Sequence, residues 1–304
     1  MAYSCADEKR GNMKVALKGA VSFFSLMLIA ACTHLSVFPP QPVSGNLQGE
    51  VRWHGKVFVE GDVVVAARSR LIIAPGTEVV FLPAAEGKDL FIERPNFPGS
   101  ELIVLGTLIA EGTTEKPITF RFVDPAAPAG SWGGINLRES TEARFRYVRI
   151  VQANSAIHSH KSKAVIEESR IENNLFGLRF HTTDFLIRNN LLRSNGTAIR
   201  FHFGAPVIRN NVIADNEKGV FITSYPRDYR IEENNIIGNR RYAVVLGEEV
   251  PDNVQMAGNY WGTDSPEAIA ASLFDGRKDD YLGKVLFAPF AEAPVFQAGP
   301  SRVP

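Results

Sequence analysis

The sequence predicts an all-β solenoid, because apolar residues, asparagines and strand-like alternation repeat at one short period. Three apolar columns advance 21 residues at a time: Phe145, Ile166, Ile187 and Ile208; Ile150, Ile171, Leu192 and Ile213; and Ile157, Leu178, Ile199 and Val220. Segments such as 178–180 are apolar at every second position, which is the periodicity of a β-strand. A repeat this short buries its apolar face only against neighbouring copies. We therefore expect a right-handed parallel β-helix with three short strands per rung and about 21–25 residues per rung.

Asparagines recur at two predicted corners with the same period. One set follows the first apolar column by three residues and consists of Asn190, Asn211, Asn234 and Asn259, with Ser169 in the earliest repeat. The other follows the second column in the same way and consists of Asn174, Asn195, Asn216 and Asn239. Because stacked rungs lie about 4.8 Å apart, each set is expected to form a structural ladder of hydrogen-bonded amides. Asn also tolerates the left-handed backbone conformation that a sharp bend requires.

The start of the chain is typical of an exported protein. Lys14 precedes an apolar stretch that begins near Val15 and ends in small residues, which predicts a signal peptide over residues 1–31. The stretch is short for a membrane span, although an uncleaved anchor centred on residues 23–28 remains an alternative. Met13 is a more natural initiator than the first residue, because the residues before it are polar.

The signal peptide leads into a cysteine with a characteristic context. Residues 29–32, Ile-Ala-Ala-Cys, resemble a bacterial lipobox, which implies cleavage before Cys32 and attachment of lipid to it. The following residue, Thr33, is not Asp, which by the same resemblance favours the outer membrane. The resemblance thus implies a cell-envelope location, as an outer-membrane lipoprotein on the periplasmic face. Residues 32–48 are Pro-rich and lack periodicity, so they predict a tether.

Beyond the tether the chain reads as one elongated domain. The predicted order is a β-helix over 49–290, an excursion from it near 83–100, a C-terminal cap over 258–290 and a tail over 291–304. Within the cap, residues 264–273 predict a short helix with Asp264 or Ser265 as N-cap, and Gly276 follows just past its end. Trp261 is expected to seal the last rung of the solenoid.

Charge and cysteine content exclude some classes of protein. Lys plus Arg and Asp plus Glu number 33 each, so the chain has no net charge that would attract nucleic acid. The two cysteines are Cys5 and Cys32, and cleavage before the second would remove the first. No disulfide framework is then available, so stability must come from the stacked apolar core.

Several segments resemble one family. Residues 258–264, Gly-Asn-Tyr-Trp-Gly-Thr-Asp, are similar to the terminal motif of bacterial right-handed parallel β-helix repeat proteins. Residues 61–65, 74–77 and 130–135 look like the entry half of the same group, and the resemblance covers about residues 50–290. It implies the carbohydrate-binding and sugar-hydrolase β-helix superfamily. That superfamily includes polysaccharide lyases, epimerases, a periplasmic copper-maturation accessory protein, adhesins and members without known activity.

Histidines and arginines form a candidate ligand strip on one predicted face. Strand alternation turns six side chains outward over three rungs: His158, His160, Arg179, His181, Arg200 and His202. Three interpretations remain open: a solvated face without a ligand, a zinc or copper site, and a contact for an anionic sugar or phosphate. Imidazole suits zinc and copper, which points to His160, His181 and His202 as metal ligands. Arg forks suit carboxylate and phosphate groups.

No pair of outward carboxylates with the spacing of a hydrolase is visible in the sequence. We therefore expect a non-catalytic protein without a cofactor, which presents a rigid surface to a polysaccharide or an envelope protein. The alternatives are a polysaccharide lyase or glycoside hydrolase acting on acidic glycans, and a periplasmic accessory protein that handles zinc or copper.

Overall fold

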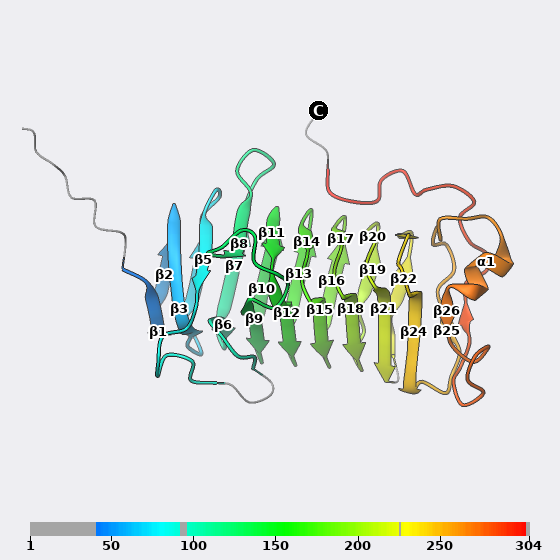
Figure 1. Cartoon of the computed structure of the whole chain (residues 1–304), viewed down its shortest axis with the longest axis horizontal. Coiled ribbons are helices and arrows are strands. Elements are labelled where there is room, and N and C mark those ends of the chain that lie inside the picture. The colour runs from blue at the N-terminus through cyan, green and yellow to red at the C-terminus, as the bar shows by residue number, and fades with distance from the viewer. Residues whose placement is uncertain (1–40, 92–95, 225, 302–304) are drawn as a thin grey trace, which may run out of the picture. The chain divides into compact units, whose positions relative to one another are not determined.

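The computed structural model describes residues 41–91, 96–224 and 226–301. The predicted signal peptide, Cys32 and most of the predicted tether lie outside these residues. Among the described residues, no helix has the length and apolar character needed to cross a membrane. The predicted β-helix is confirmed: short strands pair in parallel with the equivalent strands one rung away, and the rungs follow one another along a single axis (Figure 1).

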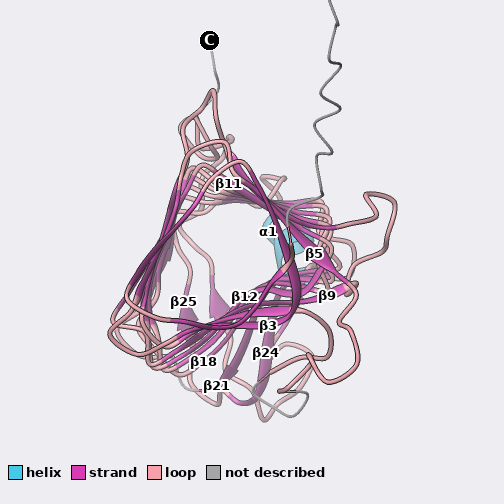
Figure 2. Ribbon diagram, turned by 90° about the vertical axis from the view of Figure 1, so that its left-hand side faces the viewer, coloured by secondary structure: helices cyan, strands magenta, loops and turns pink. Residues whose placement is uncertain are grey.

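The strands form three faces around the axis (Figure 2). Face one contains β1 (Val43–Leu47), β3 (Lys56–Val65), β6 (Glu101–Val104), β9 (Trp132–Arg138), β12 (Ala153–His160), β15 (Phe176–His181), β18 (Thr197–His202), β21 (Lys218–Ser224), β24 (Tyr242–Glu249) and β26 (Leu273–Phe274). Face two contains β2 (Glu50–Trp53), β4 (Arg70–Ile73), β7 (Thr107–Glu111), β10 (Glu142–Arg146), β13 (Lys163–Glu167), β16 (Asp184–Arg188), β19 (Val207–Arg209) and β22 (Arg230–Glu232). Face three contains the first half of β3, then β5 (Glu78–Leu82), β8 (Ile118–Phe122), β11 (Val148–Val151), β14 (Arg170–Glu172), β17 (Leu191–Arg193), β20 (Val212–Ala214) and β23 (Asn235–Ile237).

The apolar columns read from the sequence point into this tube. In face two, Ile166, Ile187 and Ile208 are direct partners in neighbouring strands, and all three side chains are fully buried. The columns of faces one and three are buried in the same way and join one continuous core. Each rung therefore contributes inward side chains from every face to stacks that exist only because adjacent rungs repeat them.

Both sets of asparagines lie at the corners and bond from rung to rung, and all of them are buried except the half-buried Asn239. Asn190 donates from its backbone nitrogen and its Nδ2 to Oδ1 of Asn211, at 2.9 and 3.0 Å. Asn195 donates to Oδ1 of Asn216 at 2.9 and 3.0 Å in the same manner. The expectation that these residues adopt the left-handed conformation is wrong. The residue before each ladder position takes it, as at Asn210 with φ of 54°, which leaves the ladder amide free to turn inward.

The two ends of the solenoid differ from the sequence-based boundaries. β1 lies inside the segment predicted as a tether. Gly45 and its neighbours pair with β3, so the solenoid begins one strand earlier than expected. At the other end, α1 (Pro266–Ala271) is capped by the Ser265 hydroxyl, which accepts a hydrogen bond from the Ala268 backbone nitrogen. The helix is shorter than the predicted 264–273 and ends at Ala271, since residues 273–274 return to face one as β26. Trp261 is buried, and its ring lies against that of Phe287. Phe287 directly follows β27 (Val285–Leu286), which pairs in parallel with β25 (Val254–Gln255).

The chain leaves the solenoid after β5 and rejoins it at β6, and the described parts of the segment between them contact the outside of face one. The described part of this segment is anchored by Asp62, whose Oδ2 accepts hydrogen bonds from the backbone nitrogens of Leu90 and Phe91 at 2.7 and 3.0 Å. Burial raises the pKa of the neighbouring Glu101 well above its usual range, and the negative charge of Asp62 adds to the shift. The excursion thus covers the N-terminal rungs of face one and leaves the later rungs open.

The C-terminal tail runs back along the solenoid over several rungs (Figure 1). Asn235 holds it at Val295, where the side-chain Oδ1 accepts from the backbone nitrogen at 2.8 Å and Nδ2 donates to the carbonyl at 3.1 Å. Further along, the Gly299 nitrogen donates to the Asn210 carbonyl at 2.8 Å. The tail therefore contacts rungs that are distant from it in sequence, on the corner between faces two and three.

Candidate functional site

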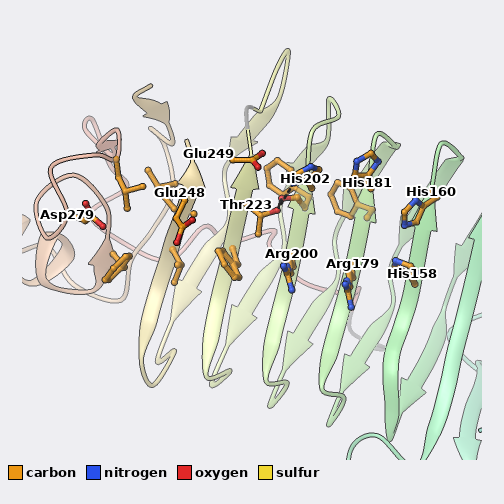
Figure 3. A pocket seen from close by; sticks show the side chains of 18 residues that line it. His158, His160, Arg179, His181, Arg200, His202, Thr223, Glu248, Glu249 and Asp279 are labelled. Carbon is orange, nitrogen blue, oxygen red and sulfur yellow. Dashed lines mark hydrogen bonds between the residues drawn. The ribbon is translucent and has the colours of Figure 1, made fainter. Parts of the chain in front are cut away.

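The outward positions of face one form two neighbouring columns. In the first column, strand register aligns His158, Arg179, Arg200, Phe221 and Val245, one per rung. In the second, it aligns His160, His181 and His202. The two columns run side by side along the open part of the face (Figure 3). The structure therefore brings together the arginines and histidines of the strip that the sequence predicts.

His158 differs from the other members of the strip. Its side chain points out of the tube as predicted, but only 4% of the residue is exposed. The ring of Phe97, from the excursion, lies edge-on against it with a centroid distance of 5.1 Å. The prediction that His158 faces solvent is therefore wrong, because strand alternation carries no information about a loop that covers the strand from outside.

The remaining histidines stack on one another. The ring centroids of His160 and His181 are 5.2 Å apart, and those of His181 and His202 are 4.8 Å apart, with interplanar angles of 13° and 21°. Burial, followed by the charge of the next imidazole, lowers the pKa of His160 and of His181. The imidazoles of His160 and His181 therefore favour their neutral form, and the strip gains positive charge as the pH falls below these two lowered pKa values.

The strip forms one half of a groove with a volume of about 690 Å³. The other half lies over β24 and the turns after β26, where Glu248, Glu249 and Asp279 line it (Figure 3). The hydroxyl of Ser224 donates to Oε2 of Glu249 at 2.6 Å. The groove is thus basic at one end and acidic at the other. Phe221, which follows Arg200 in the outward column, lies between the two ends.

The acidic end could not be read from the sequence. The step of the apolar columns lengthens after Val220, and β24 pairs with β21 through an irregular register in which Ser224 aligns with Glu249. The consecutive pair Glu248 and Glu249 is the signal that remains in the sequence, but it does not show which face the two carboxylates occupy.

A metal site is not assembled within the described part of the chain. There, no three His, Cys, Asp or Glu side chains are arranged so that they could hold one metal ion. His160, His181 and His202 instead lie one above another, so neighbouring rings are parallel rather than directed at a shared point. The expectation of zinc or copper therefore continues to rest on the sequence pattern alone.

Comparison with known proteins agrees with this geometry at the level of the fold. Residues 133–261 match a family model described as a right handed beta helix region. A search of curated proteins found no match, and neither did a search of solved structures. The matched segment includes β12, β15, β18, β21 and β24, the strands on which most of the groove is built.

Proposed function

Because the chain is a right-handed parallel β-helix repeat protein with a partly cationic groove on one face, we propose that it binds an acidic polysaccharide in that groove. The observation that carries the proposal is the repetition of a cationic or protonatable side chain on each of several successive rungs. Since stacked strands lie about 4.8 Å apart, the charges recur at roughly the length of one sugar unit. A polymer lying along the solenoid axis would meet one such side chain per sugar.

The chemistry of the two columns suits carboxylate or sulfate groups. The guanidinium groups of Arg179 and Arg200 offer several donors in a planar fork, which matches the geometry of such anions. The stacked imidazoles line the second side, and they become additional donors when protonated. Aromatic side chains such as Phe221 supply an apolar surface on which the faces of sugar rings could pack.

We favour recognition without catalysis, with an enzyme as the second candidate. Lyases and hydrolases of acidic glycans need carboxylates beside the scissile bond, either as an acid–base pair or as ligands of calcium. The groove contains such carboxylates, from Glu248, Glu249 and Asp279, and their presence supports an enzyme as the second candidate. Product analysis after long incubation with polygalacturonate distinguishes the two, since a binding protein leaves the polymer intact.

We expect replacement of Arg179 or Arg200 by Ala to weaken the binding of a galacturonate hexamer about tenfold. A charge-assisted hydrogen bond contributes about 1.5–3 kcal/mol, and exposure of the groove places the loss at the lower end of that range. Isothermal titration calorimetry at low salt measures the affinity. Arg179→Lys, which keeps the charge but loses the fork, should retain part of it.

The matched control is Arg193→Ala, on the third face. Arg193 is exposed and pairs with Asp215 at 2.9 Å, so its loss removes a surface charge of the same kind away from the groove. Affinity should remain at the wild-type level in this variant. Equal losses in Arg193→Ala and Arg179→Ala, or equal affinity for a neutral maltohexaose, would contradict recognition of anions in the groove.

We further propose that the protein is a lipoprotein of the cell envelope, held through Cys32 to the periplasmic side of the outer membrane. The segment 29–32, with its small residues before the cysteine, supports this location. The Pro-rich stretch that follows would separate the first rung, at β1, from the membrane surface.

Labelling of cells with a palmitate analogue tests the anchor. The wild-type chain should incorporate the label and partition with the outer-membrane fraction, and Cys32→Ser should abolish both because the acylated side chain is gone. Cys5→Ser serves as the control, since cleavage before Cys32 removes that residue in any case. Persistent labelling of Cys32→Ser would rule out this anchor.

A further inference from the structure

Arg179 and Arg200, which line the groove, each lie close to two phenylalanine rings. The guanidinium carbon of Arg179 lies 5.8 Å from the ring centroid of Phe97 and 5.4 Å from that of Phe176. The guanidinium carbon of Arg200 lies 6.0 Å from the ring centroid of Phe176 and 5.1 Å from that of Phe221. Each guanidinium thus lies within about 6 Å of two aromatic rings, and Phe176 is shared by both.

The stack draws its members from different parts of the chain. Phe97 belongs to the excursion, Phe176 to the start of β15 and Phe221 to β21. The arginines are direct partners in the register of β15 and β18, which fixes their backbones one rung apart. Register alone leaves the long side chains mobile, because Arg has several rotatable bonds. Contacts within about 6 Å of an aromatic centroid are attractive for a cation and restrict those rotamers.

We propose that Phe176 is a positioning residue that holds the guanidinium groups of Arg179 and Arg200 one rung apart. This inference rests on the proposed function and deepens it. With both forks held before the ligand arrives, less conformational entropy is lost on binding. The fixed spacing also selects the ligand: anionic groups on consecutive sugars fit the two forks, and anionic groups on alternate sugars do not.

Nuclear magnetic resonance of the free protein tests the stack without a ligand. Protons above an aromatic face are shifted upfield, so the Nε–H signals of Arg179 and Arg200 should lie upfield of that of an exposed arginine such as Arg170. In Phe176→Leu both signals should move back, whereas Phe176→Tyr, which keeps the ring, should preserve them. Phe58→Leu, on the half-buried outer side of β3, is the matched control and should leave both signals unchanged.

Binding measurements then test the consequence. Phe176→Leu should weaken the binding of trigalacturonate about fivefold to tenfold, which corresponds to the loss of two exposed cation–aromatic contacts, and Phe176→Tyr should restore it. The wild-type protein should bind trigalacturonate more tightly than hyaluronan hexasaccharide. The two ligands have the same number of carboxylates, placed on consecutive sugars in the first and on alternate sugars in the second.

The outcomes separate this inference from the proposed function. Phe176→Leu would overturn the positioning role if its affinity and the positions of both arginine Nε–H signals stayed at the wild-type values, even if the wild-type protein binds trigalacturonate. Equal affinity for the two oligosaccharides would overturn the spacing rule. Upfield arginine signals in a protein that binds neither oligosaccharide would contradict the polysaccharide proposal while supporting the stack.

Discussion

Ile187→Asp is expected to abolish cooperative folding of the central rungs. Ile187 is fully buried between Ile166 and Ile208, so the new carboxylate would have no water and no cation beside it. Loss of the apolar side chain costs about 2–5 kcal/mol, and burial of an unpaired charge costs several more. Because a domain is typically stable by only about 5–15 kcal/mol, the sum is comparable with the whole free energy of unfolding.

The neighbouring residue in the same strand provides the control. Leu186 precedes Ile187 in β16 but is half-exposed on the outside of face two, so Leu186→Asp should preserve the fold. Urea unfolding followed by circular dichroism compares the two variants with the wild-type protein. Similar unfolding midpoints for Ile187→Asp and Leu186→Asp would contradict the assignment of alternating positions to the inside and outside of the tube.

Asn211→Ala should be the second most damaging change, with a loss of about 3 kcal/mol. Asn211 is fully buried, and its Nδ2 donates to the carbonyls of Ile187 and Arg209 and to Oδ1 of Asn234, at 2.9, 3.0 and 2.9 Å. Its Oδ1 accepts both bonds from Asn190. Several buried groups lose a partner at once, and each unsatisfied group costs about 1–3 kcal/mol, partly offset by relaxation.

The position allows a clean comparison. Asn211 does not have a positive φ, so Ala introduces no backbone strain, and the measured loss reports on the ladder. Arg209→Ala, at an outward position two residues earlier, should change the free energy of unfolding by less than about 0.5 kcal/mol. A loss for Asn211→Ala as small as that for Arg209→Ala would show that the ladder adds little to stability.

The central rungs could be predicted because each local signal there is repeated by its neighbours. A column such as Ile166, Ile187 and Ile208 has one period and one burial pattern, so sequence spacing alone places it inside. The strength of the ladder could be predicted less well. Sequence spacing indicates one partner per Asn, which corresponds to about 1 kcal/mol, whereas the structure adds bonds to carbonyls of the rung on the other side.

The missed features all come from segments that do not repeat. Phe97 covers His158 and packs against Arg179, yet nothing in residues 83–100 shows over which face the excursion folds. Glu248 and Glu249 reach the groove through an irregular register. The tail likewise follows the corner through single contacts such as that of Asn235 with Val295. Periodicity predicts the scaffold, whereas the site depends on how unique loops lie against it.

The most direct test of the groove as a binding site is a crystal structure of the protein with trigalacturonate. We expect the sugar to lie along the axis over β15, β18 and β21, with consecutive carboxylates against the guanidinium groups of Arg179 and Arg200. Binding over another face, such as β13, β16 and β19, or binding in the groove with its carboxylates turned away from both arginines, would contradict the proposed recognition.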